Sequence, residues 1–236
     1  MRDGILIINK APGMTSHDVV ELVRRRLGTR RIGHTGTLDP MAEGVLVLVI
    51  GTATKHQQRL QAHRKQYDAT MRLGTQTDTG DAWGHVIRTA PVPALSLARI
   101  EAALRSCIGP QLQTPPMFSA VKIEGRPLYH WARRGTPRTA APRPVEIFSL
   151  ALHEFTPDTI HFHVDCSTGT YIRNLAELVA ERLETVGHLS RLVRLTVGEW
   201  HLDEAHPVEW LRHASVEAIW EAVRPIQELH ASPHRP

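Results

Sequence analysis

The longest strongly apolar run in this chain is only six residues long, which limits the folds open to it. It covers residues 45–50 and lies between Gly44 and Gly51. A helix that crosses a membrane needs about 20 apolar residues, so this run predicts a short buried strand. Near the N-terminus, the apolar residues 5–8 are too few for the hydrophobic part of a signal peptide. We therefore expect a folded cytoplasmic protein without a membrane segment.

Size and composition agree with a globular fold. The 236 residues are 42% hydrophobic and 22% charged, close to the averages for globular proteins. A chain of this length forms one large or two small domains. Its two cysteines, Cys107 and Cys166, are expected to be reduced thiols because no secretory signal is recognisable. We expect a hydrophobic core, and no disulfide framework, to stabilise the fold.

Hydrophobic periodicity predicts an irregular alternation of strands and helices, typical of a mixed α/β or α+β sheet protein. Strands are expected at residues 5–8, 45–50, 67–73, 145–154, 160–166 and 192–197, with a further strand beginning at His85. Helices are expected between Thr15 and Gly28, from Ile100 until Gly109 and Pro110, near residues 129–133, and over residues 172–183. The first helix has the best-defined start, because Thr15 and Asp18 have the spacing of a capping box.

A glycine-rich loop, residues 30–44, joins the first helix to the strand at 45–50. Three glycines and a proline interrupt every regular period in it. Because Pro40 keeps the preceding residue out of the helical region, Asp39 is held in an extended or turn conformation from which its carboxylate can project. Local sequence leaves two interpretations of Asp39 open: a functional carboxylate, or a turn residue that bonds its own backbone.

This loop does not match the known phosphate-binding patterns. It lacks the Gly-Lys-Ser/Thr ending of a P-loop, and it precedes a strand, whereas a dinucleotide-binding fingerprint opens a helix. We therefore expect no nucleotide cofactor. Hydrolysis by a Ser-His-Asp triad also has no support, because the sequence contains no Gly-x-Ser-x-Gly elbow.

A metal site is an alternative at the strand near residue 161. His161 and His163 alternate onto one face of that strand, and Cys166 follows closely. The sequence has neither the CxxC pair nor the HExxH helix that would make a zinc site specific. We therefore expect ordinary structural or surface residues and no metal, and keep a metal-dependent hydrolase as an alternative.

Positive charge is concentrated in two segments. The net charge is +4, but residues 122–143 contain six Lys or Arg against Glu124 alone, and five arginines lie within residues 24–31. A local basic surface of this kind suits a polyanion such as RNA. A solvated charged face is the alternative that charge alone would favour.

Several separated motifs, in one order, resemble the TruB family of tRNA pseudouridine-55 synthases. They are residues 4–10 (GILIINK), 12–20 (PGMTSHDVV), 33–40 (GHTGTLDP), 65–67 (KQY), 115–122 (PPMFSAVK) and 169–173 (GTYIR). The resemblance implies an α+β pseudouridine synthase fold, with a mixed, mostly antiparallel central sheet flanked by helices and loops. It also implies a uridine isomerase that acts on the T-arm of tRNA as a monomer, without metal or organic cofactor.

The resemblance assigns a role to individual residues. It makes Asp39 the catalytic aspartate and Tyr67 the aromatic side chain that stacks on the target base. Arg173 matches an arginine that pairs with the catalytic carboxylate, and such a partner would keep the carboxylate ionised. Further residues expected at the site are His34 and Leu192 near the base, and Lys10, Tyr171, Lys122, Arg126, Arg133 and Arg134 as substrate contacts.

The resemblance also suggests a domain organisation. We expect residues 1–236 to form one catalytic domain, in which residues 113–147 are a mobile basic insertion that closes over the RNA. A C-terminal RNA-binding domain of the PUA type, common in bacterial members, is expected to be absent. The alternative function is a non-catalytic RNA-binding module or tRNA folding chaperone, which would need the basic surface but not Asp39.

Overall fold

The structure is a computed structural model that describes residues 3–226, and the chain in it divides into two compact units. Unit 1 combines residues 1–63 with residues 194–236, and unit 2 is the continuous segment 64–193. The division falls inside one strand, β12 (Gly187–Val197). Unit 2 is therefore inserted in sequence between the two parts of unit 1.

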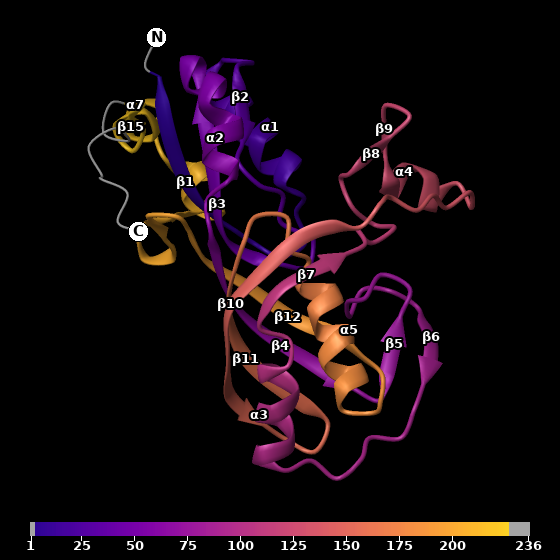
Figure 1. Ribbon diagram of the computed structural model, residues 1–236. Helices are drawn as coiled ribbons and strands as arrows, with labels where there is room; N and C mark the ends of the chain where they lie inside the picture. Colours follow the sequence, from indigo (N-terminus) through magenta and orange to yellow (C-terminus); the bar gives the residue numbers. More distant parts are fainter. Residues whose placement is uncertain (1–2, 227–236) are drawn as a thin grey trace. The chain divides into compact units, whose positions relative to one another are not determined.

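Unit 1 is built on two long neighbouring strands, β1 and β3 (Figure 1). Its elements are β1 (Gly4–Lys10), α1 (Ser16–Leu27), β2 (Ile32–His34), β3 (Glu43–Ile50), the 3₁₀ helix η1 (Gly51–His56), α2 (Gln57–Gln61), the last residues of β12, β13 (Trp200–His201), the 3₁₀ helix η2 (Leu202–Glu204), β14 (His206–Pro207), α6 (Val208–His213), α7 (Val216–Glu221) and β15 (Arg224–Pro225).

The sheet of unit 1 is mostly antiparallel and is buried on both faces. β1 pairs antiparallel with β3 along its whole length, β2 and β15 add short antiparallel pairs, and β14 pairs parallel to β1. One face of β1 and β3 forms a core cluster with Leu60, Val197 and Trp200. Residues on the opposite face, such as Leu6 and Leu48, are also fully buried. Burial on both sides explains why these strands have continuous apolar sequences and no alternation.

Helix α1 begins at the predicted capping box. The Thr15 hydroxyl oxygen accepts a hydrogen bond from the Asp18 amide at 3.1 Å, and the Asp18 carboxylate accepts one from the Thr15 amide at 2.8 Å. Gly28 ends the helix in the left-handed conformation, with φ of 62°. The helix between Thr15 and Gly28 is thus confirmed, and it buries Val19, Val20 and Val23 on one face.

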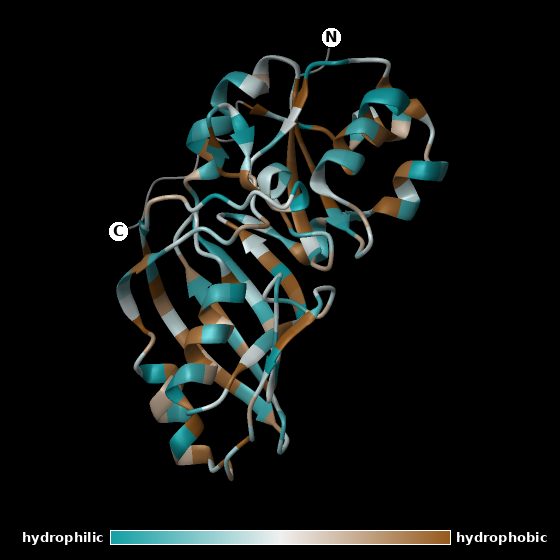
Figure 2. Cartoon of the chain, turned by 90° about the vertical axis from the view of Figure 1, so that its right-hand side faces the viewer, coloured by the Kyte–Doolittle hydropathy of each residue, from teal (hydrophilic) through white to brown (hydrophobic). Residues whose placement is uncertain are grey.

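Unit 2 contains an antiparallel sheet with strand order β4-β11-β10-β7, and the first part of β12 lies beside β4. Its elements are β4 (Lys65–Leu73), β5 (Thr75–Thr77), β6 (Val86–Thr89), α3 (Leu97–Arg105), β7 (Gly109–Gln113), β8 (Lys122–Ile123), β9 (Arg126–Pro127), α4 (Leu128–Arg133), β10 (Arg143–Phe155), β11 (Thr159–Cys166) and α5 (Ile172–Arg182). Helix α5 contacts β4, and α3 contacts both β10 and α5. The hydrophobic residues concentrate on the strands and on the inner faces of the helices (Figure 2).

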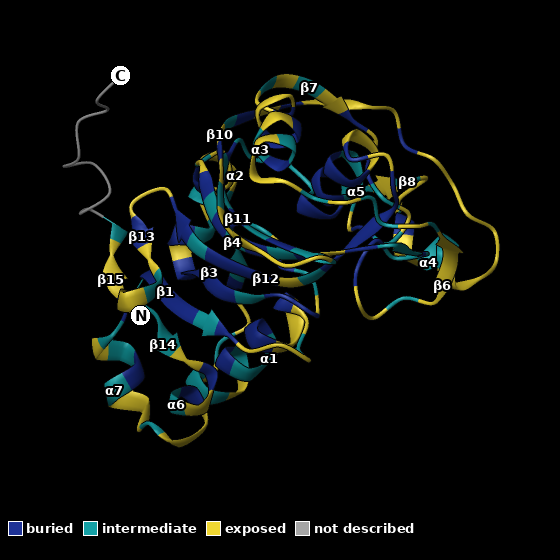
Figure 3. Cartoon of the chain, turned by 90° about the horizontal axis from the view of Figure 1, so that it is seen from below, coloured by how far each residue is buried: buried dark blue, intermediate teal, exposed yellow. Residues whose placement is uncertain are grey.

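Strand and helix patterns in unit 2 follow the expected periods. β11 alternates between half-buried and fully buried residues along its whole length, and α5 buries Leu175, Ala176 and Val179 on one face. Figure 3 shows α5 largely buried, whereas β6 is exposed and α4 is of mostly intermediate burial. The predicted α+β class with a mostly antiparallel sheet is confirmed.

The segment 113–147 contains more regular structure than expected. Helix α4 confirms the short helix predicted near residue 129, but β8 and β9 form a small hairpin before it. The two ends of the segment belong to strands, since Gln113 closes β7 and residues 143–147 open β10. The mobility of this segment stays a prediction.

Two other predictions about secondary structure are wrong. Residues 32–34, expected within the irregular loop, form β2 because they pair with β3. The helix expected from Ile100 until Gly109 is α3, and it ends earlier than predicted, at Arg105 with Ser106 as its cap. Residues 109–113 form β7 instead. Pro110 is compatible with a strand there because β7 is the last strand in the sheet order, where a missing amide donor is tolerated.

Within residues 3–226, each helix is either too short or too polar to cross a bilayer.

Replacing the cap of α1 tests how much this local contact stabilises the protein. The substitution Thr15→Ala removes the acceptor for the Asp18 amide, and we expect it to lower the free energy of unfolding by about 1 kcal/mol. Equilibrium urea unfolding measures the change. Thr139→Ala, at an exposed residue of unit 2, is the matched control and is expected to change the free energy by less than about 0.5 kcal/mol. Equal stability of the two variants would contradict the capping role of Thr15.

Candidate active site

Asp39 lies in the connection between β2 and β3, and this connection is well ordered despite its glycines. The Thr35 amide donates to the Val47 carbonyl at 3.0 Å, and the Ala42 amide donates to the Asp39 carbonyl at 3.0 Å. Leu38 is buried beside a half-buried Asp39. The backbone around Asp39 is thus tied both to strand β3 and within its own turn.

Three buried side chains from other elements bind the backbone of this loop. Ser16, at the start of α1, accepts from the Leu38 amide at 2.8 Å, and its hydroxyl lies 3.2 Å from the Leu38 carbonyl. Lys10, at the end of β1, donates to the Pro40 carbonyl at 3.4 Å. Arg194, in β12, donates to the carbonyls of Gly36 at 3.0 Å and Thr37 at 3.3 Å. The loop is therefore held on both sides of Asp39.

Lys10 has a different environment from the one expected for a substrate contact. Its side chain is fully buried, and its ammonium also donates to the carbonyls of Ala11 and Met14, at 2.9 and 2.8 Å. Burial lowers the pKa of Lys10 to about 8, although the nearby Asp39 carboxylate opposes this shift. Its position suits holding the loop, and the predicted contact with substrate has no support from it.

His34 occupies the last position of β2, at the entrance to the same loop. Burial lowers the pKa of its imidazole to about 4, and the positive charge of Arg194 adds to the shift. Its Nδ1 accepts a hydrogen bond from the Gly36 amide at 3.4 Å, which requires a neutral nitrogen there. His34 is thus a neutral ring at physiological pH, at the start of the loop that carries Asp39.

Sequence reasoning did not single out Ser16 and Arg194 as parts of the site. Ser16 lies in a quoted motif, but a serine in the first turn of a helix is ordinary. Arg194 had one visible signal, namely a charged residue inside the apolar strand predicted at 192–197. A charge at such a position is rarely buried without a specific partner.

Other predicted site residues lie in unit 2. Tyr67 is a buried residue of β4, opposite Val164 of β11, and Leu192 is a buried residue of β12. Arg173, in the first turn of α5, is 3% exposed, and its guanidinium donates to the carbonyls of Thr79 at 2.7 Å and Phe118 at 2.9 Å. Arg173 therefore links α5 to the root of the basic insertion.

The basic residues of the insertion are exposed and partly ordered by aromatic rings. Lys122, Arg126, Arg133 and Arg134 all face solvent. The guanidinium carbon of Arg126 lies 5.9 Å from the centre of the Trp131 ring, and that of Arg133 lies 5.6 Å from the centre of the Tyr129 ring. Cation–π contacts of this kind limit side-chain freedom while leaving the charge accessible.

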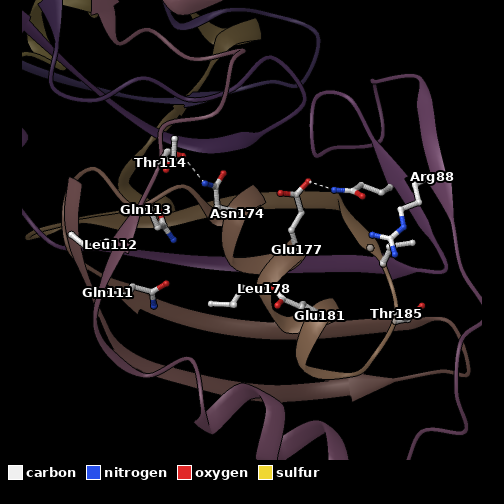
Figure 4. Close-up of a pocket in the computed structure, with 13 residues that line it drawn as sticks. Arg88, Gln111, Leu112, Gln113, Thr114, Asn174, Glu177, Leu178, Glu181 and Thr185 are labelled. Atoms are coloured by element: carbon white, nitrogen blue, oxygen red, sulfur yellow. Dashed lines mark hydrogen bonds between the residues drawn. The ribbon is translucent and has the colours of Figure 1, made fainter. Parts of the chain in front are cut away.

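A pocket of about 440 Å³ lies in unit 2 over the outward face of α5 (Figure 4). Gln113 in its wall accepts from the Tyr171 amide at 2.8 Å, and Asn174 donates to the Thr114 carbonyl at 2.8 Å. Burial raises the pKa of Glu177 in the same wall. These bonds hold Tyr171 and the start of α5 against β7, and the partly acidic lining does not suit a phosphate group.

The three residues of the metal alternative do not come together. His161 and His163 share one face of β11, whereas Cys166 lies on the opposite, buried face and its thiol contacts the Lys65 carbonyl. His161 is bound instead by Asp68, with 2.7 Å between Nε2 and Oδ1. Among residues 3–226, no group of three His, Cys, Asp or Glu side chains could hold a metal ion.

Comparison with known sequences decides the family. Residues 24–172 match the N-terminal domain of the TruB family of pseudouridylate synthases. The chain is 40% identical over 230 residues to tRNA pseudouridine synthase B of Opitutus terrae, covering 98% of this chain and 95% of that protein. It is 44% identical over 227 residues to the enzyme of the same name from Aromatoleum aromaticum, covering 96% and 73%. The chain belongs to the TruB family.

Solved structures agree with this TruB assignment. The fold is similar to that of a chain in the crystal structure of a Cbf5-Nop10-Gar1 complex, with a TM-score of 0.69 and 25% sequence identity. The match covers 95% of this chain and 60% of the other, so this chain spans about three fifths of that protein's length. The predicted pseudouridine synthase fold is confirmed.

The neutral state of His34 can be measured directly. We expect its ring resonances to stay unchanged from pH 8 to pH 5.5 and to titrate at about pH 4. Because the unfolded chain binds the proton first, this group should lower stability as the pH falls from 6.5 towards 4. NMR of selectively labelled histidine measures the titration. A His34 midpoint close to 6.5 would contradict the burial argument.

Proposed function

We propose that this chain converts uridine to pseudouridine at position 55 in the T-loop of tRNA, with Asp39 as the catalytic carboxylate. The observation that carries this proposal is the way in which the loop around Asp39 is held. Side chains from β1, α1 and β12 hold its backbone, yet the carboxylate itself is only half-buried. Membership of the TruB family supports the reaction, since the relatives named above are tRNA pseudouridine synthases.

The reaction exchanges one bond of the uridine for another. The bond between C1′ of the ribose and N1 of uracil breaks, the detached base rotates, and a bond forms between C1′ and C5. The proton on C5 is then lost to solvent and N1, now free of the ribose, gains a proton, so the uridine and the pseudouridine are isomers. A carboxylate can serve either by attacking the sugar as a nucleophile or by removing a ribose proton to give a glycal. Asp39 is the residue proposed for either route.

Other residues of the TruB motifs are proposed to support Asp39. Tyr67 would stack on the extruded uracil, with Leu192 packing nearby, and Arg173 would pair with the Asp39 carboxylate. Tyr171 would contact substrate from the start of α5. His34 would meet the RNA as a neutral ring. Because its Nδ1 accepts from the Gly36 amide, its Nε2–H can donate a hydrogen bond to a base edge.

Access to the uridine requires that the base leave the RNA stack, which costs a few kcal/mol. Contacts elsewhere on the RNA have to offset this cost. The exposed basic residues of segment 113–147 are suited to phosphate contacts, which position the RNA without reading its sequence. We propose that this segment binds the T-arm. We also propose that the protein acts on tRNA as a monomer.

Release of tritium from tRNA transcribed with [5-³H]uridine tests the catalytic role of Asp39. Asp39→Asn keeps a residue that forms turns readily but removes the ionised carboxylate. We expect it to lower turnover by at least about 1000-fold while leaving the affinity for tRNA within about twofold. Asp158→Asn, which removes a carboxylate of unit 2 whose side chain is 49% exposed, is the matched control and should retain wild-type turnover.

Three results would separate the possible functions. Turnover by Asp39→Asn close to that of the wild type would contradict the catalytic assignment. Primer extension after carbodiimide treatment maps the position of the pseudouridine. Modification at a position outside the T-loop would contradict the substrate assignment. Tight binding by the wild type without any release would favour the RNA-binding module or folding chaperone.

Salt dependence tests the proposed role of the basic insertion. The double substitution Arg133→Ala and Arg134→Ala removes two exposed charges, so the slope of log affinity against log salt should become shallower by about 1 to 2. Arg105→Ala, an exposed arginine of α3 in the same unit, is the control and should leave the slope unchanged. Fluorescence anisotropy with labelled tRNA over a series of KCl concentrations measures it. Equal slopes for all three proteins would place the RNA contacts elsewhere.

A further inference from the structure

We infer that Arg194 is a positioning residue for Asp39, and that its guanidinium holds the catalytic loop in the conformation used for isomerisation. This inference rests on the proposed function. Arg194 is 1% exposed, so it is too deeply buried to serve as a phosphate contact. It can therefore act on the reaction only indirectly, through the groups that surround it in the protein interior.

The guanidinium joins the two ends of the segment that carries Asp39. Its Nε donates to the Val45 carbonyl in β3 at 2.7 Å, while its two terminal nitrogens donate to the Gly36 and Thr37 carbonyls. A planar fork with donors on both sides can bind three carbonyls at once, whereas a lysine ammonium on a flexible stem cannot reproduce that geometry. The arrangement therefore specifically requires arginine.

The packing of Gly44 gives independent support. Gly44 has φ of 109°, a conformation that L side chains rarely adopt, and a Cβ at this position would collide with the backbone of Arg194. The strand carrying Arg194 thus approaches the start of β3 as closely as backbones allow. This close approach brings the guanidinium to the loop carbonyls and leaves it little freedom to move.

Energetics exclude a simple packing role for this side chain. Taking a guanidinium out of water costs several kcal/mol unless hydrogen bonds compensate, and an apolar residue of similar volume usually serves a core at least as well. The preceding residues of β12, Leu192 and Val193, are indeed apolar and buried. The charge at position 194 is therefore explained by the carbonyls it binds.

Arg194 also acts on the other ionisable groups of the site. Its positive charge contributes to the lowered pKa values of Lys10 and His34, after burial as the main cause. The protonation of His34 therefore reports on the guanidinium. A purely structural role for the Arg194 stem would not produce this dependence.

Two substitutions separate geometry from charge. Arg194→Met removes both the hydrogen bonds and the charge, and Arg194→Lys keeps a cation but loses the fork. For Arg194→Met we expect kcat for tritium release to fall by about 100-fold with KM changed less than threefold, since a small misplacement of a catalytic group has that cost. For Arg194→Lys we expect a fall of about 10-fold. Arg212→Met, at an exposed arginine of α6, is the control and should leave kcat unchanged.

Readouts that do not depend on activity complete the test. In Arg194→Met, hydrogen exchange at the Leu38 and Ala42 amides should accelerate by at least about 10-fold while the Leu48 amide is unchanged, because only the loop loosens. The His34 titration should move upwards from about pH 4 in this variant and stay near that value in Arg194→Lys. If Arg194→Met fails to fold, Arg194→Lys carries the test through its kcat and its amide exchange.

Outcomes for the inference and for the proposed function are distinct. The inference is overturned, whatever the activity, if Arg194→Met folds and its Leu38 and Ala42 amides exchange hydrogen at the wild-type rate. If Arg194→Met does not fold, the same result in Arg194→Lys overturns it. Wild-type kcat in both variants also overturns it. A wild-type protein that releases no tritium contradicts the proposed function alone, and the loosening of the loop in Arg194→Met would then still be observed.

Discussion

Hydrogen bonding between buried cations and backbone carbonyls is the interaction on which the candidate site depends. Lys10 and Arg194 together bind six carbonyl groups, three each. Neither cation could be buried at an acceptable free energy without these acceptors, and the carbonyls would themselves be costly to bury without donors. The loop and the two cations thus stabilise one another. A glycine-rich segment, which would be mobile on its own, becomes a rigid support for one carboxylate.

The two kinds of positive charge in this protein have different tasks. The cations beneath the Asp39 loop are buried and act at short range on backbone and on neighbouring ionisable groups. The arginines of segment 113–147 are exposed, and we propose that they act through water on a polyanion, where salt screens them. The proposed function therefore assigns chemistry and affinity to separate sets of residues, which sequence composition alone does not distinguish. The net charge of +4 counts buried and exposed cations alike.

Sequence patterns predicted the elements whose signals are local. The apolar runs identified β1 and β3, and the capping box identified the start of α1, because these signals depend on residues close together in the chain. Strand β7 was missed because its glycine and proline are normal only at a sheet edge, which sequence does not reveal. The importance of Asp39 came from the resemblance to the TruB family. The role of Arg194 could not be predicted, since its partner Thr37 lies 157 residues away in sequence.

The insertion of unit 2 within unit 1 affects how the protein is made. Unit 2 is continuous in sequence and can fold as soon as it leaves the ribosome, whereas unit 1 has to wait for its second part. At translation rates of about 5 to 20 residues per second, the residues that Arg194 binds are synthesised roughly 8 to 30 s before Arg194 itself. During that interval the loop around Asp39 has none of its contacts with β12. A nascent chain therefore contains the whole basic segment 113–147 before the loop around Asp39 can acquire its contacts with Arg194.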